Sequence, residues 1–342
     1  MVLGGSLLTA AIVAVDLATG PKSTFSPVLT AVPVLAGVGT RRALVPLFAG
    51  LLTAAVVVLL VFLNPQVPEI VHATAAAAVL AVALISSANV SLVAMREREL
   101  VQVRTVSETA QRALLRPVPD RVGTLRIAVR YLAAAAEARI GGDLYEVVRT
   151  AQGIRLLLGD VRGKGLTAVE TAADVLGVFR EAALAEPDLA EVAVRLDSAL
   201  NRRLTAEDFV TAVLLDVPET TGPALVVNCG HPPPLLATAT GVSEVQPPGY
   251  APPLGLLGMS GQGRYSAGSL WLGEGDLLLL YTDGVSEARD NSGRFYPLAE
   301  RLAHLNGHDP GTVLDHLVAD VRAYVDGGLG DDAALLAIRR VR

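Results

Sequence analysis

The charged residues of this chain are distributed very unevenly, and that distribution limits what the chain can fold into. Of its 28 Lys and Arg and 34 Asp and Glu residues, only five lie within residues 1–95. These are Asp16, Lys22, Arg41, Arg42 and Glu69. The rest of the chain has the charge density of an ordinary soluble protein. The sequence therefore predicts a membrane part over residues 1–95, followed by a soluble part.

Two segments of the first part, 43–63 and 70–95, are uncharged and long enough to cross a bilayer as helices. Segments 2–18 and 26–40 are shorter candidates, so we expect three or four spans and favour four. No basic region precedes the first apolar run, which argues against a cleaved signal peptide. Arg41, Arg42 and the arginines after residue 95 orient the set by the positive-inside rule. The soluble part is expected in the cytoplasm of a multi-pass membrane protein.

Residues 96–116 are rich in charge and predict a linker helix. Apolar residues recur within it at helical spacing, at Val103, Val106, Ala110 and Ala113. This stripe is compatible with a short parallel coiled coil, through which two copies of the chain could form a homodimer. A plain amphipathic connector helix explains the pattern equally well. Pro117 and Pro119 end the helix.

Acidic residues recur in the soluble part, 117–342, beside glycines and at the ends of apolar, strand-like runs. They are Asp143, Asp160, Asp283 and the pair Asp331 and Asp332. Any one of them alone is more simply an ordinary turn. Together they would place several carboxylates near the core without partners, a cost that a shared cation relieves. An oxygen-only ligand set suits Mg²⁺ or Mn²⁺.

The remaining features of the soluble part narrow the class of protein. Short strands with two inserted helical pairs, 166–184 with 188–204 and 300–305 with 313–325, predict an α+β sandwich. The net charge of −6, with no stripe of Lys and Arg, argues against a nucleic-acid partner. Cys229 is the single cysteine, so no intramolecular disulfide can form, and its strand-like surroundings favour a buried apolar role.

Five motifs, GGDLYE, GDVRGKG, NCGHPPPLL, YTDGVSEA and GDDAALL, occur in this order. The series resembles the metal-dependent protein phosphatase family in its bacterial SpoIIE/RsbU branch, over about residues 119–342. The resemblance implies an α+β fold, a four-layer αββα sandwich, preceded here by an all-α transmembrane bundle and the linker helix. It also implies two bound Mn²⁺ or Mg²⁺ ions.

The resemblance assigns roles to individual residues. Asp160 bridges both ions, and the Val161 carbonyl binds one of them. Asp143 joins the second ion directly or through water, while Asp283 and Asp331 complete the first. Asp332 is the alternative if Asp331 is dispensable. Asp143, Asp160 and Asp283 are thus the expected catalytic residues.

Two further positions bear on the chemistry. Lys164 stands where relatives commonly carry His, which removes a proton donor but leaves a cation that can attract a phosphopeptide. His231 is expected to be a turn residue hydrogen-bonded to its own loop.

The expected function is that of a membrane-anchored serine/threonine phosphatase that acts through a metal-activated water. In the branch that the motifs resemble, the substrate is a phosphoserine on an anti-anti-sigma (STAS) protein. The alternative is a catalytically silent, membrane-bound scaffold whose phosphatase-like domain binds a partner without turnover. The expected partners are this phosphoprotein, the lipid bilayer and a second copy of the chain.

Overall fold

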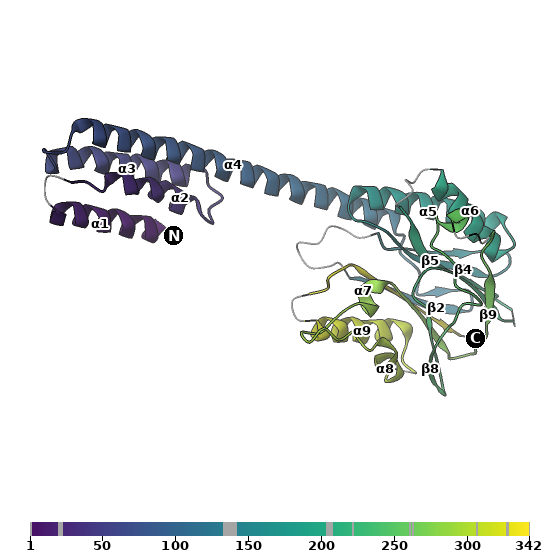
Figure 1. Cartoon of the computed structure of the whole chain (residues 1–342). Coiled ribbons are helices and arrows are strands. Elements are labelled where there is room, and N and C mark those ends of the chain that lie inside the picture. The colour runs from purple at the N-terminus through teal and green to yellow at the C-terminus, as the bar shows by residue number, and fades with distance from the viewer. Residues whose placement is uncertain are drawn as a thin grey trace. The chain divides into compact units, whose positions relative to one another are not determined.

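A computed structural model describes residues 2–19, 23–132, 142–202, 208–220, 222–259, 261, 263–305, 307–325 and 328–341. The chain divides into two compact units, Met1–Gln102 and Val103–Arg342. Figure 1 labels many of their elements. Each unit is described by itself.

The first unit is entirely helical. Its elements are α1 (Val2–Thr19), the short 3-10 helix η1 (Ser26–Thr30), α2 (Ala31–Gly37), α3 (Leu44–Leu63) and the first part of α4 (Glu69–Leu114). Leu29, Val57, Leu60 and Val79 are buried in its core, whereas Leu52 and Phe62 on α3 are 71% and 78% exposed. Apolar side chains on an outer helix face mark a surface that contacts a membrane or another protein.

Two helical segments of the described residues, Leu44–Leu63 and Glu69–Glu99, are long and apolar enough to span a membrane. The apolar segments Leu7–Asp16 and Ser26–Gly37 are shorter. The predicted segment 26–40 contains a 3-10 turn followed by a seven-residue helix, because Pro27 and Pro33 interrupt its run. The number of spans stays a prediction.

Helix α4 continues without a break through most of the predicted linker and ends at Leu114, shortly before Pro117. The side chains of Val103 and Val106, half of the predicted coiled-coil stripe, lie outside the described residues. In the second unit, Leu114 and Leu115 at the end of the helix pack against a buried apolar cluster. The last turn of α4 is therefore part of the second unit's fold.

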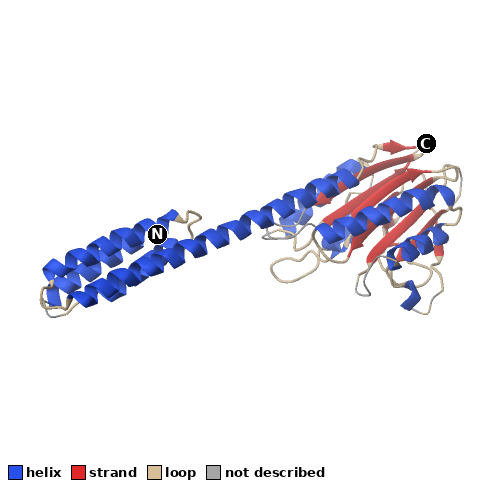
Figure 2. Ribbon diagram, turned by 90° about the horizontal axis from the view of Figure 1, so that it is seen from above, coloured by secondary structure: helices blue, strands red, loops and turns tan. Residues whose placement is uncertain are grey.

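The second unit contains two antiparallel sheets, drawn as red strands in Figure 2. The six-stranded sheet has the order β1 (Arg121–Val122), β2 (Leu125–Leu132), β11 (Ala333–Arg340), β10 (Leu277–Tyr281), β7 (Leu235–Thr238), β8 (Gly241–Glu244). The five-stranded sheet has the order β3 (Leu144–Arg149), β4 (Ile154–Val161), β5 (Val210–Val217), β6 (Ala224–Cys229), β9 (Ala267–Leu270).

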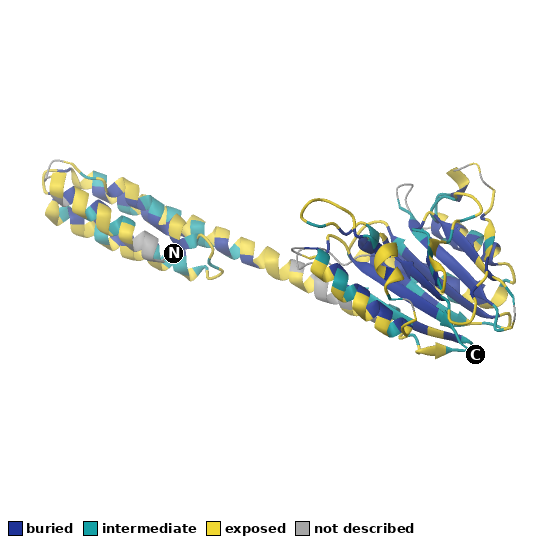
Figure 3. Cartoon of the chain, turned by 90° about the horizontal axis from the view of Figure 1, so that it is seen from below, coloured by how far each residue is buried: buried dark blue, intermediate teal, exposed yellow. Residues whose placement is uncertain are grey.

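The central strands of both sheets are buried on both faces and are drawn dark blue in Figure 3, whereas β1 and β8 at the edges are largely exposed. Leu156 and Leu158 on β4 join Leu278 and Leu336 in the core between the sheets. Leu157, on the opposite face of β4, packs with α5 (Leu166–Ala185) and α6 (Leu189–Asn201). The helices α8 (Leu298–Ala303) and α9 (Pro310–Tyr324) cover the other sheet. The expected four-layer α+β sandwich is confirmed.

Local details agree with the sequence patterns. The side chain of Asp188 accepts a hydrogen bond from the Ala190 amide, 2.9 Å long, and so caps α6 as expected. Cys229 is buried. The end of the predicted helix 188–204 lies outside the described residues. Strands β1, β3 and β8 were not predicted, because they are short or carry charged and polar residues.

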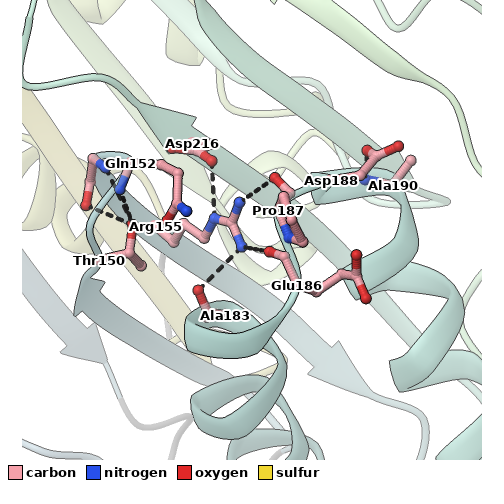
Figure 4. A network of polar contacts seen from close by, with 10 residues as sticks. Thr150, Gln152, Arg155, Ala183, Glu186, Pro187, Asp188, Ala190 and Asp216 are labelled. Atoms are coloured by element: carbon pink, nitrogen blue, oxygen red, sulfur yellow. Dashed lines mark hydrogen bonds and ion pairs between the residues drawn. The ribbon is translucent and has the colours of Figure 1, made fainter.

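Arg155 anchors the strand that carries Asp160, as Figure 4 shows. Its guanidinium is fully buried and contacts Asp216 on β5 at 2.8 Å. It also donates to the backbone carbonyls of Ala183, Glu186 and Pro187, where α5 ends. All of these groups depend on one charge for their hydrogen bonds, so Arg155 joins β4, β5 and the α5–α6 turn.

Replacing Arg155 tests this anchor. Arg155→Met removes the buried donor that Asp216 and the Ala183 carbonyl share in the interior, so we expect the free energy of unfolding to fall by about 3 kcal/mol. Urea denaturation of the full chain, followed by the fluorescence of its single tryptophan, Trp271, measures this. Arg195→Met, which removes an exposed ion pair with Glu181, is the control and should cost less than about 1 kcal/mol. Equal losses in the two variants would contradict the anchoring role.

Candidate functional site

The acidic residues singled out by sequence lie at strand ends in both sheets. Asp160 is near the end of β4, and Asp143 directly precedes β3. These strands pair with Leu144 opposite Gly159, so Asp143 and Asp160 are neighbours in the five-stranded sheet. In the other sheet, Asp283 follows β10 and begins the short helix α7 (Asp283–Ser286). The Asp331–Asp332 pair directly precedes β11, the strand that pairs with β10.

Two glycines allow these loops to approach one another. A Cβ atom at Gly142 would lie 2.4 Å from the Val161 carbonyl oxygen, and one at Gly284 would lie 1.9 Å from the Asp332 carbonyl oxygen. Neither position can carry a side chain without moving the backbone. Gly142 therefore holds the Asp143 loop against Val161, and Gly284 holds the Asp283 loop against Asp332.

The carboxylates of the two sheets share one electrostatic environment. Burial, followed by the charge of Asp160, raises the pKa of Asp143 well above its usual value. Burial, followed by the charges of Asp283 and Asp331, raises the pKa of Asp160 to about 7. Burial and the charges of Glu287 and Asp331 also raise the pKa of Asp283. The fold thus gathers acids from both sheets, and neighbouring negative charges disfavour the ionisation of Asp143, Asp160 and Asp283.

Protein donors hold three of the acids. The Thr282 hydroxyl donates to Asp143 at 2.9 Å, and the Tyr131 hydroxyl donates to Asp332 at 2.6 Å. Lys164 forms an ion pair with Asp331, with its Nζ 2.7 Å from the carboxylate. Lys164 therefore lies beside the acids as expected, in contact with one of them.

The end of helix α4 reaches the same network. The Gln111 amide donates to the Tyr131 hydroxyl at 3.1 Å and to the backbone carbonyl of Asp143 at 3.3 Å. One side chain of the linker helix thus contacts both the Asp143 backbone and Tyr131, the residue that holds Asp332. The sequence did not single out Gln111 or Tyr131, because neither belongs to a glycine-rich motif. Thr282 could have been found from sequence, because it lies in the YTDGVSEA motif and directly precedes Asp283.

The donor types at this site fit hard divalent cations. They are carboxylates together with the Val161 carbonyl, and oxygen ligands with net negative charge are what Mg²⁺ and Mn²⁺ require. Among the described residues, no three Asp, Glu, His or Cys side chains are arranged to hold an ion as they stand. Asp143, Asp331 and Asp332 instead point to Thr282, Lys164 and Tyr131.

His231 forms its hydrogen bonds to groups other than the acids. Its backbone amide donates to Asn228 at 2.9 Å, and its Nδ1 is 3.1 Å from the Thr211 hydroxyl. Burial lowers the pKa of its imidazole to about 3. It is therefore a neutral turn residue, but its partners are Asn228 on β6 and Thr211 on β5, so the expected bond to its own loop is not what the structure shows.

A model of the family "Stage II sporulation protein E (SpoIIE)" matches residues 150–341. Among solved structures, the RsbU and RsbW domains of a protein from Mycobacterium tuberculosis are 29% identical, with a TM-score of 0.52. That match covers 64% of this chain and 61% of the other. This chain thus spans about three fifths of the mycobacterial structure.

Two further structures are similar at 20% identity, which shows the fold alone. The SiaA-PP2C domain of Pseudomonas aeruginosa has a TM-score of 0.60, over 73% of this chain and 99% of that domain. The PP2C phosphatase domain of SpoIIE from Bacillus subtilis, with a fragment of its regulatory domain, has a TM-score of 0.55. The coverage is 64% of this chain and 65% of the Bacillus chain.

The raised pKa of Asp160 predicts a pH-dependent stability in metal-free buffer. An aspartate titrates at about pH 4 in the unfolded chain, whereas Asp160 has a pKa of about 7 in the folded chain. Between these two pH values the folded chain binds more protons than the unfolded chain. Stability therefore falls as the pH rises through this window. Asp160→Asn removes the pH-dependent loss of stability that Asp160 causes. The difference in melting temperature, variant minus wild type, should therefore grow from pH 4 to 8.

Thermal unfolding of the full chain in chelator, at several pH values, measures this difference. Glu191→Gln, at an exposed position on α6, is the control and should follow the wild type throughout. A difference between Asp160→Asn and wild type that is constant with pH would show that Asp160 does not titrate in this window.

Proposed function

Because the chain belongs to the SpoIIE family, we propose that it is a metal-dependent protein phosphatase that hydrolyses phosphoserine or phosphothreonine. The observation that carries this proposal is the convergence of Asp143, Asp160, Asp283 and Asp331 from loops of both sheets. Each of the first three has a pKa raised by burial and by other acids of the site. Such mutual repulsion is unfavourable in the protein alone and is relieved by bound cations.

We propose that Asp160 would hold both of two divalent ions, Mn²⁺ or Mg²⁺, and that the Val161 carbonyl would hold one of them. Asp143 serves the second ion, and Asp283 and Asp331 serve the first, with Asp332 as the alternative to Asp331. When bound, such a pair of ions supplies charge to the phosphoryl oxygens and makes a water nucleophilic near neutral pH.

The chain's own residues prepare this site. Thr282 fixes Asp143 by its hydrogen bond and itself accepts a bond from the Ala334 amide at 2.9 Å, so the acid is tied to β11. Asp331 must leave Lys164 to become a ligand. Once released, the Lys164 ammonium is a cation at the site that can attract the substrate phosphate.

The proposed substrate is a phosphoserine on a STAS-type anti-anti-sigma protein. Two observations support it: the order of the five motifs, and the similar mycobacterial structure, which is described as containing RsbU and RsbW domains. The net charge of −6 disfavours nucleic acid as a competing partner.

We further propose that residues 1–95 anchor the chain in the bacterial membrane, with the phosphatase domain, 117–342, in the cytoplasm. The helices Leu44–Leu63 and Glu69–Glu99 support this by their length and composition. The linker helix, 96–116, could then carry an input to the site, alone or as a homodimer, since Gln111 near its end bonds to Tyr131 and to the Asp143 backbone.

The activity is tested with purified full chain in detergent, Mn²⁺ and a phosphoserine peptide. Asp160→Asn removes the ligand shared by both ions, so we expect the turnover rate to fall by about a hundredfold or more. Glu191→Gln should retain wild-type turnover. Wild-type protein that binds a phosphoprotein without hydrolysing it would favour the scaffold alternative instead.

Lys164 provides a test of the site's charge balance. Because its ammonium neutralises Asp331, Lys164→Met should make the site more negative and tighten Mn²⁺ binding at pH 8 by about threefold or more. Isothermal titration calorimetry measures the affinity, with Arg195→Met on α6 as the control for loss of a distant cation. Weaker Mn²⁺ binding in Lys164→Met would show that Lys164 supports the metal site instead of competing with it.

A further inference from the structure

A groove of about 480 Å³ opens directly beside the acid site. Asp283 forms part of its wall, so the groove and the acid site share one side chain. The groove is otherwise lined by residues of β5, β6, the end of β8 and the loops that follow β6 and β8, among them Thr211, His231, Glu244, Pro247 and Tyr250. None of these five is a proposed metal ligand, and we call this surface the flanking groove.

Hydrogen bonds hold the floor of the flanking groove, and one of its residues lies directly opposite Asp160 in the sheet. Thr211 lies opposite Asp160 in the β4–β5 pair, and its hydroxyl bonds to His231 Nδ1 at 3.1 Å. Asn228 holds the His231 loop through two hydrogen bonds, accepting from the His231 amide at 2.9 Å and donating to its carbonyl at 2.8 Å. A molecule in the groove would therefore meet a preformed surface and would not have to order it.

The walls of the flanking groove favour a polypeptide. Pro232, Pro233 and Pro247 line it, and proline rings present apolar faces with fixed backbone geometry. Tyr250, at the same groove, is 89% exposed. A large, amphipathic ring held in solvent beside a polar site is typical of residues that anchor a protein partner.

Charge limits which polypeptide fits. Among the described residues that line the flanking groove, the charged ones are Glu244 and Asp283. Glu244 is exposed and accepts a hydrogen bond from Gln246 at 2.8 Å. An acidic segment would be repelled by this wall, whereas a basic side chain would be attracted to Glu244.

We propose that the flanking groove binds the segment of the phosphoprotein next to its phosphoserine, and that Glu244 selects segments with a basic residue there. The inference rests on the proposed phosphatase activity, since the phosphoserine must lie at the acids beside Asp283. Tyr250 packs on the bound segment, while the proline walls hold it extended. Thr211, His231 and Asn228 support this surface without taking part in the reaction.

Two phosphoserine peptides and p-nitrophenyl phosphate test the proposal. The peptides differ only in carrying lysine or glutamate on both sides of the phosphoserine, and p-nitrophenyl phosphate has no flanking segment. The full chain in detergent with Mn²⁺ is assayed for kcat/KM on all three. We expect wild-type protein to prefer the lysine peptide, and Glu244→Gln to reduce that preference by about threefold.

Tyr250→Ala should lower kcat/KM for both peptides, relative to that for p-nitrophenyl phosphate, by about tenfold. Two matched controls lie outside the groove: Trp271→Ala removes another aromatic ring, 66% exposed, and Glu191→Gln removes another exposed acid. Both should keep the wild-type ratios. Each result is a ratio of kcat/KM values measured on one preparation of protein. Partial unfolding lowers all of these values by the same factor, so it cannot produce the expected change in the ratio.

The outcomes separate this inference from the proposed function. Hydrolysis of p-nitrophenyl phosphate with unchanged ratios in Glu244→Gln and Tyr250→Ala would overturn the flanking groove and leave the phosphatase proposal intact. Changes of equal size in the controls would also overturn it. Wild-type protein that hydrolyses none of the three substrates would overturn both proposals.

Discussion

The interaction that explains most of the second unit is an unfavourable one. Its two sheets bring several carboxylates close together, and these carboxylates repel one another. Asp143 and Asp160 come from adjacent strand ends of one sheet, and Asp283 and Asp331 from those of the other. Burial raises the pKa values of the first three, and neighbouring charges raise them further. A fold that retains such a cluster is less stable for it, and the proposed binding of cations would account for the cost.

The structure around the acids resists that repulsion. Arg155 ties β4 to β5 and to the α5–α6 turn, so the strand bearing Asp160 is fixed at its other end. Thr282 and Tyr131 each hold one acid by a hydrogen bond, and Lys164 neutralises another. The same supports explain why Asp143, Asp331 and Asp332 point to Thr282, Lys164 and Tyr131. The flanking groove then extends the site from Asp283 along a proline-lined wall.

Much of this arrangement was predictable from sequence, for a physical reason. An aspartate beside glycine at the end of an apolar run marks a strand end where a loop turns sharply, as at Asp160 and Asp283. The sandwich follows from alternating short strands and helical pairs. The partners of the acids were not predictable, since Gln111 and Tyr131 lie far from the motifs and only the fold brings them close. The side-chain directions of Asp331 and Asp332 likewise depend on contacts that no local pattern encodes.

Proton release on Mn²⁺ binding tests the central claim most directly. Calorimetric titration of the full chain near pH 7, in two buffers of different ionisation enthalpy, counts the ions bound and the protons released. The account predicts two Mn²⁺ ions per chain, with release of protons from acids such as Asp160, whose pKa is about 7, and loss of both signals in Asp160→Asn. Mn²⁺ binding that releases no proton, or that persists unchanged in Asp160→Asn, would contradict it.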